Sequence, residues 1–152
     1  MPAALIGKTL LNRYHIEEFI TRTPLGDQHR ATDERSHKAV ALTILPKHIA
    51  ESAEAIKELD AKSRKLQEIS HPNLTKHLGV YQTPTHAFLL EEWVDGPSLK
   101  HILEKAPVSA DEALVYAKAI CGALDALHKK NFLHLHLAPE LIRINQRGEI
   151  QV

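Results

Sequence analysis

The chain has 152 residues, of which 43% are hydrophobic and 25% charged, and equal numbers of acidic and basic side chains give it zero net charge. That length is enough for one domain with its own core, and zero net charge gives no field to recruit nucleic acid or an anionic membrane. The single cysteine, Cys121, excludes an internal disulfide and predicts a reducing, cytoplasmic compartment. No apolar run approaches the roughly 18 residues of a membrane span, and the N-terminus lacks a signal-peptide pattern.

The first 45 residues predict strands joined by turns. Residues 14–20 alternate apolar and polar side chains, which is typical of a half-buried strand. Residues 23–27 have the composition of a turn, and residues 28–32 then form the returning strand. The apolar, β-branched run at 39–45 predicts a further strand, which Pro46 closes.

Residues 52–69 change to the period of a helix. Ser52 is a suitable N-cap, and an apolar stripe follows with charged residues on the other faces, formed by Ile56, Leu59, Leu66 and Ile69. Residues 78–81 and 87–90 then predict a hairpin. Gly96-Pro97 breaks the chain after it.

The remaining segment predicts helices and one small hairpin. A short helix is expected near 98–104 and a long one from about 109 to 129, with a buried stripe of Ala113, Ala117, Ile120, Leu124 and Leu127. Cys121, on the buried side of the long helix, is expected in the core. Residues 141–144 and 149–152 flank a turn sequence and predict a hairpin. Strands with one helix, followed by a helical region, indicate an α+β fold in two lobes.

The segment His134-Leu135-His136-Leu137-Ala138-Pro139-Glu140-Leu141 has the outline of the motif H-R-D-L-x-x-x-N, the catalytic loop of protein kinases. Four further landmarks occur in the matching order: the turn at 21–26, the strand at 40–44, His71-Pro72-Asn73-Leu74, and the segment 92–99. Together they make the chain resemble a bacterial Hanks-type serine/threonine protein kinase over nearly its whole length.

The resemblance implies one truncated kinase-like domain over residues 1–152. Residues 1–94 would form the N-lobe, an antiparallel five-stranded sheet with one helix of the αC type. Residues 95–152 would contain the hinge, the long helix, the catalytic-loop-like segment and a hairpin, as a partial helical C-lobe.

The same resemblance places unsuitable residues at the phosphate-binding positions. Thr21, Thr23 and Gly26 stand where the family has three loop glycines, and Thr43 stands where it has the strand lysine. The helix glutamate that would orient that lysine corresponds to Lys62, or to Glu58 if the register slips by one turn.

The catalytic and metal-binding positions are also replaced. His136 stands for the catalytic aspartate and Leu141 for the metal-binding asparagine, and the expected Asp-Phe-Gly segment lies beyond Val152. Imidazole is able to accept a proton, but phosphoryl transfer depends chiefly on positioning and on metal ions. We therefore expect no catalytic residue and no metal site, and we interpret His136 as a structural or exposed loop residue.

Two charged residues are unusual at their positions. Lys62 occupies the place of the helix glutamate, and Glu91 stands before the hinge, where the family has an apolar or small residue. Their opposite charges suggest an ion pair that fills part of the nucleotide pocket. The alternative is that both side chains turn toward solvent.

These replacements predict a catalytically inactive, pseudokinase-like binding or regulatory module without a cofactor. Its partner would be a protein, or a second copy, bound through the N-lobe or through an exposed C-lobe helix. A second hypothesis is residual binding of ATP, for which we do not expect Mg²⁺, through Ile20, Gly26, Ala41, Glu92 and Val94. A third is an enzyme that uses His136 as its base, and a fourth is a purely structural domain.

Overall fold

The computed structural model describes residues 5–152, and these residues form two units. Unit 1 comprises the chain up to Glu68 together with Lys76–Trp93, and unit 2 comprises Ile69–Thr75 and Val94–Val152. An antiparallel sheet with helices in unit 1, and helices with a small hairpin in unit 2, give the predicted α+β class.

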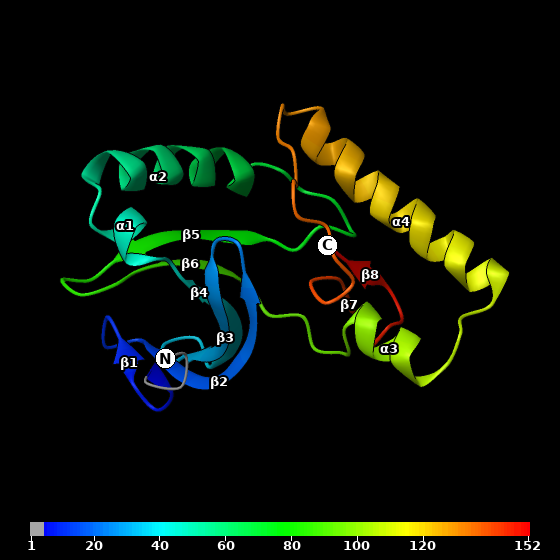
Figure 1. Cartoon of the computed structure of the whole chain (residues 1–152), viewed down its shortest axis with the longest axis horizontal. Helices are drawn as coiled ribbons and strands as arrows, with labels where there is room; N and C mark the ends of the chain where they lie inside the picture. Colours follow the sequence, from blue (N-terminus) through cyan, green and yellow to red (C-terminus); the bar gives the residue numbers. More distant parts are fainter. Residues whose placement is uncertain (1–4) are drawn as a thin grey trace. The chain divides into compact units, whose positions relative to one another are not determined.

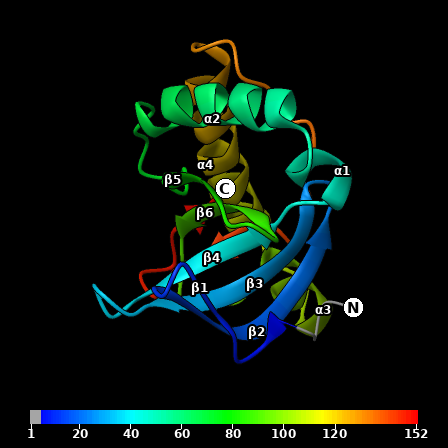
Figure 2. The ribbon, with the colours of Figure 1, turned by 90° about the vertical axis from the view of Figure 1, so that its left-hand side faces the viewer.

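Unit 1 is built on a six-stranded antiparallel sheet, which curls strongly (Figure 2). Its spatial order is β1-β2-β3-β4-β6-β5, from strands β1 (Thr9–Leu10), β2 (Tyr14–Thr23), β3 (Gly26–Asp33), β4 (Lys38–Ile44), β5 (His77–Gln82) and β6 (Ala87–Glu92). The sheet has one strand more than the five predicted. The additional strand, β1, is only two residues long, which is too short to show an alternating pattern.

Two helices connect β4 to β5 in unit 1. They are α1 (Lys47–Ala50) and α2 (Ala53–Gln67). Ser52 caps α2 as predicted, because its side chain accepts a hydrogen bond from the Ala55 amide. Helix α2 packs along β5, as Figure 1 shows.

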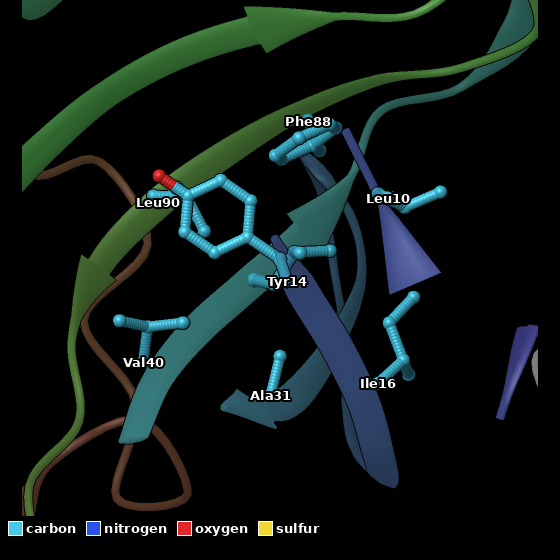
Figure 3. Close-up of a cluster of buried hydrophobic side chains, with 8 residues drawn as sticks. Leu10, Tyr14, Ile16, Ala31, Val40, Phe88 and Leu90 are labelled. Atoms are coloured by element: carbon cyan, nitrogen blue, oxygen red, sulfur yellow. The ribbon is translucent and has the colours of Figure 1, made fainter. Parts of the chain in front are cut away.

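An aromatic cluster holds the curled sheet together. Tyr14 meets Phe88 edge to face with ring centroids 6.0 Å apart, and Tyr81 stacks on Phe88 at 5.8 Å. Figure 3 shows aliphatic side chains from β1, β2, β3, β4 and β6 gathered around Tyr14 and Phe88, namely Leu10, Ile16, Ala31, Val40 and Leu90. Burial raises the pKa of Tyr14 to about 12, so its hydroxyl is neutral at physiological pH.

Unit 2 contains helices α3 (Leu99–Lys105) and α4 (Ala110–His128) and a hairpin of β7 (Arg143–Ile144) and β8 (Ile150–Gln151). Its core joins α3 to this hairpin through Leu99, Ile142, Ile144 and Ile150. The segment 69–75 belongs to this unit because Asn73 Nδ2 donates to the Ile150 carbonyl at 2.9 Å, and the Val152 amide donates to the Asn73 carbonyl at 2.9 Å.

Two sequence-based expectations for α4 are wrong. Ala113 and Ala117 are exposed, and so is Cys121, whereas the buried residues of the helix are Ala123 and Leu127. Apolar residues lie on more than one face of this helix, so periodicity placed Ile120 and Leu127 correctly but misplaced Ala113, Ala117 and Cys121. Within residues 5–152, no helix is both long and apolar enough to cross a bilayer.

Candidate functional site

The segment that matches a phosphate-binding loop is a tight hairpin turn. Strands β2 and β3 stay paired up to Thr23 and Gly26, so the turn itself consists of Pro24 and Leu25 alone. The Thr23 hydroxyl donates to the Gly26 carbonyl at 3.0 Å and accepts from the Leu25 amide at 3.2 Å. Thr23 therefore uses the backbone groups of the turn that glycines would leave open to a ligand.

An exposed ion pair between β2 and β3 stabilises the same hairpin. Arg22 and Asp27 are cross-strand neighbours, and Arg22 Nε donates to Asp27 Oδ1 at 2.7 Å. The nearest guanidinium to the turn is thus neutralised by a carboxylate of the same hairpin. The arrangement favours a closed turn over an anion-binding loop.

Thr43 lies in a row of neutral side chains across the sheet. Directly paired residues share a face, and the register places Thr21 beside Gln28, Gln28 beside Thr43, and Thr43 beside Leu89. Thr43 is buried, at 3% exposure. The position of the expected strand lysine thus carries no charge, and neither do its cross-strand neighbours.

The adjacent row on this face contains one cation, Arg30, which is already engaged. Arg30 is paired across the strands with Glu18 and Ala41. Its guanidinium forms an ion pair with Glu17 and lies 5.6 Å from the ring centre of Trp93. Sequence reasoning missed this cluster, because its members come from separate strands and the segment beyond β6.

The structure does not form the predicted ion pair between Lys62 and Glu91. Lys62 Nζ instead contacts Glu58 Oε1 at 2.6 Å, one turn earlier on the outer face of α2, and both side chains are exposed. Glu91 Oε1 lies 3.9 Å from Nδ1 of His77. An exposed i, i+4 partner costs Lys62 little desolvation, whereas reaching Glu91 would bury its charge.

A polar contact links α2 to this part of the sheet. Ser63 Oγ lies 2.7 Å from His77 Nε2, and both residues are buried. The sequence analysis singled out neither of these two residues. Their contact across 14 residues depends on the packing of α2 on β5.

The residues named for residual adenine binding are divided between the two units. Ile20 is half-buried in β2, Gly26 begins β3, Ala41 is buried in β4, and Glu92 ends β6. The Glu92 amide donates to the Lys76 carbonyl at 2.9 Å. Val94 belongs to unit 2.

The catalytic-loop-like segment 134–141 is irregular and largely exposed. Leu135 has a φ of 57° and is 87% exposed, and the His136 amide donates to the His134 carbonyl at 2.7 Å. His136 is exposed, and Leu141 is half-buried with its amide bonded to the Ala138 carbonyl. Within residues 5–152, no three acidic, histidine or cysteine side chains gather in an arrangement that would hold a metal ion.

Comparison with known proteins identifies the family. A family model described as protein kinase domain matches residues 14–152. Similar proteins include the probable serine/threonine-protein kinase PknB of Lactococcus lactis, 28% identical over 149 residues, and the serine/threonine-protein kinase PrkC of Bacillus subtilis, 27% identical over 149 residues. The cAMP-dependent protein kinase type 3 of Saccharomyces cerevisiae is 26% identical over 147 residues.

These matches cover 97%, 97% and 96% of this chain, respectively, but only 24%, 23% and 37% of the relatives. The chain thus spans much less than half of the length of these relatives. The family model covers most of the chain, from the first residue of β2 to Val152. This chain belongs to the protein kinase family.

Proposed function

We propose that this chain is a catalytically inactive, pseudokinase-like module that acts by binding protein rather than by transferring phosphate. The observation that carries the proposal is the neutral row Thr21, Gln28, Thr43. The triphosphate of ATP carries several negative charges, and kinases hold it with loop amides, a strand lysine and metal ions. In this row Thr43 stands in place of the lysine and Thr21 in place of a loop glycine, so the row offers no positive charge to the triphosphate.

The other half of the catalytic machinery supports the same proposal. Leu141 has no metal-binding atom in its side chain, at the position where the family has asparagine. His136 supplies an imidazole where the family has a carboxylate, so neither position offers an oxygen ligand to Mg²⁺. A base without bound metal leaves the charge that develops in phosphoryl transfer uncompensated.

A ligand titration tests the proposal directly. The unfolding midpoint of the chain would be measured with ATP, with ATP and Mg²⁺, and with adenosine, alongside an active kinase as positive control. We expect no shift from any of the three ligands. Equal shifts with ATP and adenosine would indicate adenine binding without phosphate contacts, and the chain would then be a residual nucleotide binder.

An activity assay on the longest natural form of the protein completes the test. We expect no transfer of labelled phosphate to protein substrates and no release of phosphate from ATP. Mg²⁺-dependent transfer that disappears in His136→Ala would overturn the proposal in favour of an enzyme with a rewired base. His128→Ala is the matched control, because His128 is an exposed histidine at the end of α4.

A further inference from the structure

Three polar side chains of unit 1 form a string from α2 into the sheet. Ser63 lies on α2, His77 is the first residue of β5, and Glu91 lies on β6. Ser63 Oγ is 2.7 Å from His77 Nε2, and His77 Nδ1 is 3.9 Å from Glu91 Oε1. We propose that this string is the tie that fixes α2 on the sheet, in place of the lysine–glutamate ion pair that Thr43 and Lys62 are unable to make.

The pattern of burial along α2 shows why the contact between Ser63 and His77 is important for holding the helix on the sheet. Ser63 alone among the fifteen residues of α2 is buried, at 1% exposure. The apolar residues that face the sheet, Ile56, Leu59 and Leu66, are each half-buried. The helix thus has no deeply buried apolar anchor, and the Ser63–His77 contact is its most enclosed interaction with the sheet.

The donors and acceptors of the string are mutually consistent. The negative charge of the Glu91 carboxylate, which lies nearer to Nδ1, favours the tautomer of His77 that carries its proton on Nδ1. Nε2 of His77 then accepts a hydrogen bond from the Ser63 hydroxyl. Ser63 Oγ in turn accepts from Gln67 Nε2 at 3.5 Å. The 3.9 Å separation from Glu91 is too long for a direct hydrogen bond, so the carboxylate acts on the Nδ1–H group only as a nearby negative charge.

The position of Lys62, which precedes Ser63 on α2, shows that the tie differs from the family's lysine–glutamate ion pair. Lys62 turns to the outer face of α2 and pairs with Glu58. The tie therefore runs through the next residue of the helix and meets β5 and β6, without any group from β4. It requires no bound phosphate to complete it, so α2 keeps one position on the sheet whether or not a nucleotide is present.

Hydrogen exchange of the α2 amides in the full chain tests the tie. Removing the Ser63 hydroxyl leaves a buried imidazole nitrogen without its partner, and we expect Ser63→Ala to raise α2 exchange about tenfold, with amides of the β2–β3 hairpin unchanged. Alanine has the higher helix propensity, so this increase would not come from a weaker helix. Lys62→Ala, which breaks only the exposed pair with Glu58, is the matched control and should change α2 exchange less than about twofold.

Several results would overturn the tie. One is α2 exchange in Ser63→Ala that stays within about twofold of the wild type, and another is an equal increase in Lys62→Ala. Ser63→Thr keeps the hydroxyl and should restore most of the protection. His77→Phe should also loosen α2; if it fails to fold, Ser63→Ala decides, because it removes only one oxygen.

Hydrogen exchange also tests whether the position of α2 on the sheet is independent of nucleotide. An excess of ATP, at the highest concentration of the titration above, should leave α2 exchange of the wild type unchanged, and added protection of α2 by ATP would refute this part of the inference. The tie does not rest on the proposed function, because it concerns only contacts between α2 and the sheet. Detection of phosphate transfer would disprove the proposed function but would not affect the Ser63→Ala test of the tie. Conversely, a negative result for Ser63→Ala would disprove the tie but would not affect the nucleotide titration.

Discussion

A Cβ atom on Gly26 would lie 1.8 Å from the carbonyl oxygen of Ile44, closer than any side chain is able to approach. Gly26 also has a φ of 140°, which L-residues rarely adopt. The glycine of this turn is thus required by the approach of β3 to the end of β4. Its presence is explained by the fold and is no sign of a retained phosphate loop.

Gly26→Ala should therefore destabilise the protein strongly. Backbone strain and a clash with main-chain atoms act together, and we expect a loss of about 3 kcal/mol in the free energy of unfolding, measured by urea denaturation. Gly148→Ala is the matched control, because Gly148 has a φ of 79° but no atom within 4 Å of the added Cβ. It should lose only about 1 kcal/mol, and equal losses in the two variants would contradict the role of the Ile44 contact.

Removing the Asp33 carboxylate should destabilise unit 1. Arg13 donates to both oxygens of Asp33, at 2.8 and 2.7 Å, and Ser36 donates to it as well. We expect Asp33→Asn to lose about 2 kcal/mol at pH 7, because the buried carboxylate that accepts from Arg13 and Ser36 is replaced by an amide with a single acceptor oxygen. Asp27→Asn breaks the more exposed pair with Arg22 and should lose less than about 1 kcal/mol.

The same pair gives the stability of the protein a dependence on pH. The Arg13 guanidinium holds the pKa of Asp33 well below its usual value of about 3.9. The folded state therefore favours the ionised form, so the contribution is complete above about pH 5 and is lost as the pH falls below about 4. The urea midpoint should fall between pH 7 and pH 3 by less in Asp33→Asn than in the wild type. An equal fall in both proteins would show that other groups cause the acid sensitivity.

Helix α4 should depend on its N-terminal cap. Ser109 accepts a hydrogen bond from the Glu112 amide, and the Glu112 carboxylate accepts one from the Ser109 amide, which holds the pKa of Glu112 below its usual value. Ser109→Ala should cost about 1 kcal/mol of stability, measured by urea denaturation. Ser109→Thr retains a hydroxyl and should remain near the wild type, so a similar loss in both variants would argue against capping.

The exposed face of α4 should promote association. Leu114 and Val115 are 55% and 62% exposed. We expect the chain to self-associate in sedimentation velocity experiments, and the double variant Leu114→Lys, Val115→Lys to weaken the association about tenfold or more, because two large apolar side chains no longer leave water. Lys118→Gln, on the same helix, should have little effect. A chain that stays monomeric at every concentration tested would contradict self-association through this face of α4.

Most of the secondary structure was predictable because it depends on local patterns. The strand alternation from Tyr14, the cap at Ser52 and the turn at 145–148 each act over a few residues, and the structure places β2, α2 and the β7–β8 hairpin accordingly. The family followed from motifs in order, and the match over residues 14–152 confirms it. The two-residue strand β1 and the four-residue helix α1 were missed, because each carries too few residues for a pattern.

The partners of individual side chains were not predictable, because they depend on distant segments. Lys62 pairs with Glu58 instead of Glu91, and Cys121 is exposed although its helix is amphipathic. The contact of Ser63 with His77 exists only because α2 packs on β5. The sequence by itself determined most of the elements and which residue types stand at the family's phosphate-binding positions, because both are properties of residue type and spacing. The tertiary structure alone decided which groups meet, because burial and hydrogen bonding between elements select one partner among several that the sequence allows.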